Sequence, residues 1–162
     1  MKKIININNL KYFPQEKDDW CRYACTQMLL GFKGITCFDQ KKFFEIHRHG
    51  MDNYEKNTSN FIENLNFVVQ GIMEYRRDPD LTGNDIKNYI INDNPVCVIL
   101  YLKRNDDYGH SYIVYGFDDS INLFYVIDPD DASRKELSYS DFDLYFNTNR
   151  QSHSVKEIFI VK

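Results

Sequence analysis

The chain has 162 residues, a length that fits one domain with a sizeable hydrophobic core. Its net charge is −4 and it has no block of lysines and arginines, so a basic surface for nucleic acid is excluded and no nucleic-acid partner is expected. No apolar run reaches the length of a membrane span or of a signal peptide, which predicts no membrane partner and a cytoplasmic location, with export by a signal-independent route as the alternative.

The first strong pattern in the chain is a buried helix over residues 20–31. Apolar side chains recur there at three- and four-residue spacing, as they do on the buried face of a helix. Asp18 and Asp19 stand where helix caps occur, and Gly31 and Gly34 are expected to end the helix.

Two shorter helices are expected next. Asp39 can cap a helix that runs to about His47, and both His47 and His49 then fall near its C-terminus, where a cation suits the helix dipole. Thr58 or Ser59 can begin a second helix at the segment FIENL.

Residues 67–93 contain a less regular pattern. The segment FVVQGIMEY is expected to form a strand or a buried connection, and Arg76–Asp80 a solvated turn. Thr82 is expected to cap a helix over GNDIKNYIIND, which Pro95 follows.

After Pro95 the pattern changes from helical to β. Branched and aromatic residues dominate the remaining apolar runs, with turn residues such as Asp118–Ser120 between them. Strands are predicted at residues 96–102, 110–117, 123–128 and 156–162, a polar turn at Arg104–Tyr108 and a short capped helix at 138–146.

Cys21 is the candidate nucleophile. It falls in the first turn of the predicted helix, where we expect it to be half exposed. A helix N-terminus carries partial positive charge and unpaired amides, and both favour the thiolate form that attacks carbon. A cysteine taken alone is more often a buried core residue, so the assignment depends on a histidine and its partner elsewhere in the chain.

His110 and Asp128 are the candidates for that histidine and its partner. His110 opens one predicted strand and Asp128 ends the next. If these strands pair about a turn near Asp119, the two residues are equidistant from the turn and lie close together. Their chemical roles would be general base and then acid for His110, and orienter of the imidazole for Asp128.

The set Gln15-x5-Cys21, GHSYIVYGFD and YVIDPD resembles the papain-like cysteine peptidases. It is most similar to the compact bacterial branch that includes bacteriocin-leader-processing peptidase domains and effector-type cysteine proteases. The resemblance implies that Cys21 is the nucleophile, His110 the base and Asp128 the third member. It implies that Gln15 donates a hydrogen bond to the oxyanion, together with the backbone N–H of Cys21.

The same resemblance implies an α+β fold, with a helical half packed against a twisted antiparallel sheet and the active site in the cleft between them. Residues 1–162 are expected to form a single papain-like peptidase domain. The sequence departs from plant papain at Asp128, where papain has asparagine, and at Arg22, which is bulkier than expected beside a nucleophile.

The predicted function is cleavage of a peptide or isopeptide bond in a protein or peptide substrate, without a cofactor. Deamidases, transglutaminases and other acyltransferases use the same thioester chemistry, so they are alternatives, as is a catalytically inactive binding module. A zinc site is a weaker alternative, because the available spacings do not match those of structural zinc sites. Its ligands would be Cys21, Cys25, His47 and His49.

Overall fold

The computed structural model describes residues 1–9, 12–48, 58–100, 109–146 and 156–162. The helices are α1 (Cys21–Phe32), α2 (Gln40–Arg48), α3 (Thr58–Val68), α4 (Gly83–Ile91) and α5 (Tyr139–Phe146), and a short 3-10 turn spans Ile7–Asn9. The strands are β1 (Lys2–Ile4), β2 (Met73–Asp78), β3 (Val96–Leu100), β4 (His110–Asp118), β5 (Leu123–Asp128), β6 (Ser133–Ser138) and β7 (Lys156–Val161).

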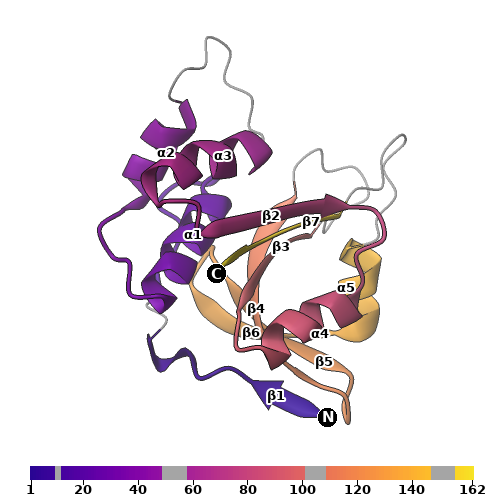
Figure 1. Cartoon of the computed structure of the whole chain (residues 1–162). Helices are drawn as coiled ribbons and strands as arrows, with labels where there is room; N and C mark the ends of the chain where they lie inside the picture. Colours follow the sequence, from indigo (N-terminus) through magenta and orange to yellow (C-terminus); the bar gives the residue numbers. More distant parts are fainter. Residues whose placement is uncertain (10–11, 49–57, 101–108, 147–155) are drawn as a thin grey trace.

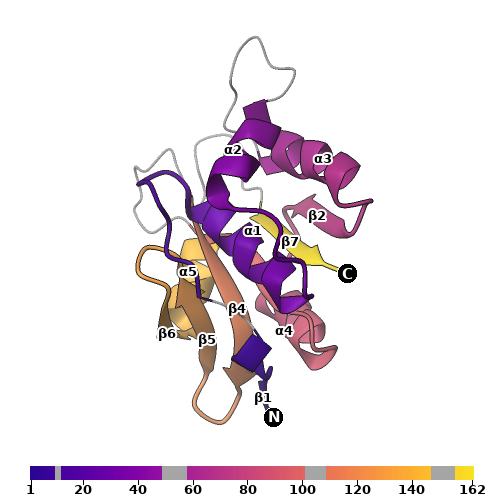
Figure 2. The same ribbon diagram turned by 90° about the vertical axis from the view of Figure 1, so that its left-hand side faces the viewer.

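The strands pair into one antiparallel sheet, in the order β2-β7-β3-β4-β5-β6. Strand β1 pairs with the C-terminal end of β4. Strand β7, the last in the sequence, therefore lies between β2 and β3 (Figure 1). Every residue of β3 is buried, so both faces of the sheet centre must be covered. Helix α1 packs on one face, against β4 and β7, and helices α4 and α5 pack on the other (Figures 1 and 2). The predicted α+β class is confirmed.

Helix α1 begins at Cys21 without a side-chain cap. Its N-cap is Trp20, which makes no capping hydrogen bond, so the prediction that Asp18 or Asp19 caps the helix is wrong. The turn before the helix is closed instead by the Trp20 N–H, which donates to the Lys17 carbonyl at 3.0 Å. Because the Trp20 indole is buried, hydrophobic packing fixes the start of the helix.

The C-terminus of α1 forms a Schellman motif around Gly34, as the glycine there predicts. Gly34 has a φ of +84°, the Ile35 N–H donates to the Leu30 carbonyl at 2.9 Å, and the Gly34 N–H donates to the Gly31 carbonyl at 3.0 Å. Gly31 lies inside the helix, so its predicted role as a stop is wrong.

Helices α2 and α3 build an aromatic cluster beside α1. Asp39 caps α2 as predicted, because its Oδ1 accepts from the Lys42 N–H at 2.7 Å. His47 lies in the last turn of α2, but it is fully buried and its Nδ1 lies 2.7 Å from the Tyr23 hydroxyl. It is thus part of the core next to Phe61, not an exposed cation at the helix end.

The irregular stretch before α4 differs from its prediction. Phe67 and Val68 end α3 with exposed side chains, and Arg76–Asp78 belong to β2, paired with β7, where a solvated turn was expected. Thr82 does cap α4, because its side chain and that of Asp85 form a reciprocal capping box.

The C-terminal sheet follows the prediction in β3, β4, β5 and β7, whereas β6 was missed. None of its residues is buried, and β6 lacks the apolar alternation that marks a strand in sequence. The predicted helix start near Ser138 is confirmed, since its hydroxyl accepts from the Asp141 N–H at 3.1 Å. The predicted turn at Arg104–Tyr108 lies in the range 101–108, outside the described residues.

Candidate active site

Cys21 is the first residue of α1, on the helix that packs against β4. Its side chain is 9% exposed, so it is more buried than the half exposure expected from sequence. As the first helical residue it has a backbone N–H with no intrahelical acceptor. The structure thus places a thiol and a free amide at the same helix end.

His110 and Asp128 lie in direct contact, at the start of β4 and the end of β5. The His110 Nε2 and the Asp128 Oδ1 are 2.9 Å apart. The predicted register was wrong: the observed pairing of Ile113 with Ile127 continues to place Asp128 opposite Tyr112, not opposite His110. The two side chains still meet, because diagonal neighbours two residues away on the same face of a sheet are within reach of long side chains.

The Cys21 thiol and the His110 imidazole shift one another's pKa. Burial acts to raise the pKa of Cys21, but a hydrogen bond to His110 and the charge of the imidazolium outweigh it, so the pKa lies below its ordinary value. Burial acts to lower the pKa of His110, but hydrogen bonds to Asp128 and Cys21 raise it to about 10. At neutral pH these directions favour a thiolate–imidazolium pair.

The Asp128 carboxylate is held by donors from three places in the fold. Its Oδ1 accepts from His110 and from the Asp130 N–H at 3.0 Å, and its Oδ2 accepts from the Lys135 ammonium at 2.6 Å. The side chain is 6% exposed. Burial acts to raise its pKa, but these hydrogen bonds hold the pKa well below the ordinary range, so the group stays ionised.

Gln15 is attached to the turn that follows Asp128. Its backbone N–H donates to the Pro129 carbonyl at 2.6 Å, and its side-chain Nε2 donates to the Asp18 carbonyl at 3.3 Å. The Nε2 has a second proton that this bond leaves available. Gln15 lines a pocket of about 420 Å³ together with Glu16, Lys17, Asp18 and Asp130.

A comparison with known protein families assigns the chain to one of them. Residues 7–153 match the family model described as the Peptidase C39-like family, which covers most of the chain. The chain belongs to the C39-like peptidase family. It is therefore a papain-like cysteine peptidase, and the resemblance stated from its motifs is confirmed.

Solved structures support the same fold for this C39-like peptidase. A structure described as a putative C39-like peptidase from Bacillus anthracis aligns over 99% of this chain and 98% of its own, with a TM-score of 0.70 at 15% identity. The peptidase domain of Streptococcus ComA, a bifunctional ABC transporter of a quorum-sensing pathway, aligns over 94% of this chain and 99% of its own, with a TM-score of 0.62 at 16% identity. The comparison with curated protein sequences gives no match.

The other cysteines of the C39-like peptidase lie in different environments. Cys25, one turn after Cys21, is fully buried, and its Sγ donates to the Ser111 carbonyl at 3.6 Å. Burial and the neighbouring Cys97 raise the pKa of Cys25 well above its ordinary value, so it is a packing residue. Cys37 is an exposed free thiol.

The side chains around His110 are better suited to hydrogen bonding with one another than to binding a metal ion. In the described ranges, His110, Asp128 and Asp130 bring three ligand atoms within 4.8 Å of one another. Both Asp128 oxygens already accept hydrogen bonds, one of them from the Lys135 ammonium, which would repel a cation. Of the residues in the alternative zinc set, His49 lies outside the described residues.

Sequence reasoning missed the residues that surround the pair formed by His110 and Asp128. Lys135 was missed with β6, and Asp130 was noted only as part of the motif YVIDPD that ends a predicted strand. Tyr112 packs edge-on against the His110 ring, with centroids 4.7 Å apart, and burial raises its pKa above the ordinary range. The signal for Tyr112 was available, since residues two apart on a strand share a face.

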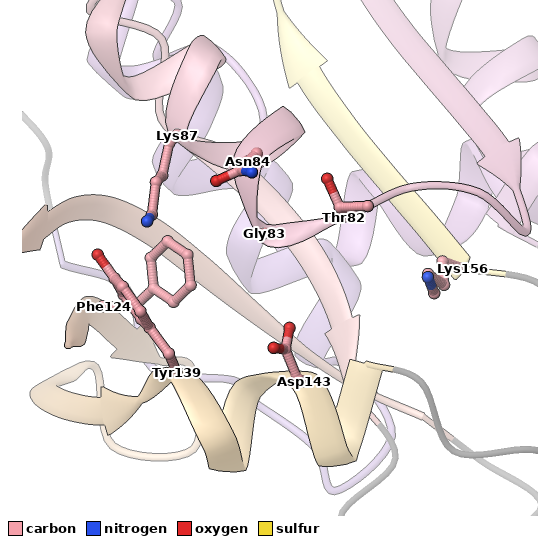
Figure 3. Close-up of a pocket in the computed structure, with 8 residues that line it drawn as sticks. All are labelled: Thr82, Gly83, Asn84, Lys87, Phe124, Tyr139, Asp143 and Lys156. Atoms are coloured by element: carbon pink, nitrogen blue, oxygen red, sulfur yellow. The ribbon is translucent and has the colours of Figure 1, made fainter. Parts of the chain in front are cut away.

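A second pocket, of about 290 Å³, lies at the start of α4 between α5 and β7 (Figure 3). Its two ammonium groups are already engaged. Lys87 pairs with Asp119 at 2.7 Å and lies over the Tyr139 ring, and Lys156 donates to the Leu81 carbonyl. We therefore assign the chemistry to the Cys21 site.

Within the described ranges, every helix is too short or too polar to cross a membrane.

Proposed function

We propose that this C39-like peptidase hydrolyses peptide bonds in protein or peptide substrates at Cys21. The observation that carries the proposal is the His110–Asp128 hydrogen bond, together with the effect of the imidazole on the thiol at the start of α1, whose pKa it lowers. Asp128 engages Nε2 of the imidazole, which leaves Nδ1 to share a proton with the sulfur. The three side chains form a nucleophile, a base and an orienting carboxylate.

In the first half of the reaction, the Cys21 thiolate attacks the substrate carbonyl carbon and a C–S bond forms. The carbonyl π electrons move to oxygen, where the Cys21 N–H and the second Nε2 proton of Gln15 stabilise the oxyanion. As the oxyanion collapses, the C–N bond breaks and the His110 imidazolium gives its proton to the leaving amine. The product is a thioester with a neutral imidazole beside it.

In the second half, the neutral His110 takes a proton from water while the water oxygen attacks the thioester carbon. The collapse of the second oxyanion breaks the C–S bond, and the carboxylic acid product leaves. The thiolate and the imidazolium are thereby restored. Asp128 stays ionised throughout and holds the imidazole in one orientation.

Alkylation at about pH 6 tests the nucleophile, because only a thiol with a lowered pKa is then substantially ionised. In a Cys37→Ser background we expect iodoacetamide to modify Cys21 alone, since Cys21 is 9% exposed and has a lowered pKa, whereas Cys25 and Cys97 are 0% exposed. Peptide mass spectrometry locates the adduct. Cys21→Ala should abolish labelling, whereas Cys25→Ala, one helical turn away, should leave it unchanged.

Labelling that persists in Cys21→Ala would contradict the assignment of the nucleophile. A substrate assay then separates the reaction types. Incubation with a peptide mixture should give new chain ends, whereas a mass gain of about one unit without cleavage would mean deamidation. Selective labelling with neither product would indicate a binding module.

Gln15→Ala tests the oxyanion donor. We expect kcat for peptide hydrolysis to fall by about 10²–10³-fold, because one donor to the oxyanion is lost. The rate of Cys21 alkylation should not change, because alkylation forms no oxyanion. Gln27→Ala is the matched control, since Gln27 also donates its Nε2 to a backbone carbonyl, that of Phe38 at 3.3 Å. Equal kcat values for the two variants would contradict the role of Gln15.

A further inference from the structure

Lys135 lies on the far side of the Asp128 carboxylate from His110. Its Nζ is 2.6 Å from Oδ2, and the imidazole Nε2 is 2.9 Å from Oδ1. The carboxylate is 6% exposed, while Lys135 is 47% exposed. One carboxylate therefore joins two cations, the partly buried imidazolium near the thiol and an ammonium at the protein surface.

This arrangement bears on the acidity of His110. A lone buried carboxylate stabilises the imidazolium strongly and raises its pKa. An imidazolium that holds its proton too tightly is a poor acid for the leaving amine. The Lys135 ammonium on the second oxygen offsets the charge of Asp128. The carboxylate therefore remains an acceptor for Nε2 of His110, but it contributes less negative potential at the imidazole.

We propose that Lys135 is a positioning residue that neutralises Asp128 and thereby keeps His110 acidic enough to protonate the leaving amine. The Asp128–Lys135 pair then acts as a neutral acceptor, as the asparagine of plant papain would. Lys135 also fixes the plane of the carboxylate, because it occupies the oxygen that His110 does not. The inference rests on the proposed function, in which His110 is the general acid.

Other charges near His110 stay in place when Lys135 is changed. Within the part of the chain that the structure describes, the titratable and charged groups that face the imidazole come from α1, from β4, from the end of β5 and from β6. They are Cys21, Tyr112, Asp128, Asp130 and Lys135. Among them only Lys135 carries a positive charge, so its removal has a predictable sign.

The test is the titration of His110 by NMR, with ¹⁵N-labelled histidine and the signal assigned through His110→Gln. A Cys21→Ala background removes the thiolate, so the titration reports Asp128 and Lys135 and does not depend on the proposed nucleophile. Lys135→Gln removes the charge but keeps an N–H donor. We expect the pKa of His110 to rise by about half to one pH unit, a range that allows for solvent screening of the half-exposed ammonium.

Lys135→Arg should restore the original titration, and Lys135→Met provides a second neutral variant should Lys135→Gln fold poorly. Lys2→Gln is the matched control: Lys2 pairs with Asp118, which is also 6% exposed, at 3.0 Å at the opposite end of the same hairpin. It should leave the pKa of His110 unchanged. A pKa in Lys135→Gln or Lys135→Met equal to or below that of the parent would overturn the inference, whatever the alkylation of Cys21 shows.

Discussion

His110→Gln is expected to slow the alkylation of Cys21 at about pH 6 by up to roughly a thousandfold. Burial acts to raise the pKa of the thiol, and the imidazole is the main group that lowers it, with a smaller contribution from Ser111. Without His110 the pKa should return to at least its ordinary value of 9.0, which is about three units above the pH of the assay. Peptide hydrolysis should fall by about 10⁴–10⁶-fold, since the acid and base are both lost.

The pH dependence of alkylation shows in which direction His110 shifts the pKa of the Cys21 thiol. In the parent, the rate should reach its plateau well below pH 9, because the thiolate pairs with an imidazolium whose pKa is about 10. In His110→Gln the plateau should move to higher pH. The reference is the unfolded protein in denaturant, where Cys21 reacts as an ordinary thiol. Coincident pH profiles of alkylation for the parent and His110→Gln would contradict the role of His110 in lowering the pKa of Cys21.

Phe61→Ala should lower the free energy of unfolding by about 3–5 kcal/mol, as expected for a fully buried ring. Phe61 is 0% exposed, and its ring centroid lies 5.1 Å from that of Tyr23 and 5.4 Å from that of His47. Since Tyr23 follows Cys21 by two residues on α1, this cluster supports the helix that carries Cys21. Chemical denaturation measures the change.

Phe67→Ala is the matched control for that experiment. Phe67 is on the same helix, α3, but it is 90% exposed. Its removal should alter the free energy of unfolding by no more than about 0.5 kcal/mol. Similar losses for both variants would mean that the aromatic cluster does not stabilise the fold as its packing indicates.

The sequence was most informative where burial and local capping agree. The strand β3 could be predicted because all five of its residues are apolar and it follows Pro95, and α4 because Thr82 and Asp85 form a capping box. The start of α1 was harder to place, since the indole of Trp20 is buried there and no acidic cap is used. Packing of this kind depends on residues distant in sequence.

The candidate site was predictable in its members but not in its details. His110 and Asp128 were placed together by an approximate count from the turn. A bulge between Val114 and Gly116 shifts the pairing along the hairpin, and no pattern in the sequence predicted this bulge. Lys135 was missed because an exposed strand without apolar alternation looks like a loop.

The place of β7 in the sheet has a consequence for how this peptidase matures. A ribosome releases the chain from its N-terminus, so the thiol of Cys21 emerges long before Lys156–Val161, which must insert between β2 and β3. The strands that hold the imidazole and the carboxylate therefore gain their full support only after β7 has been synthesised.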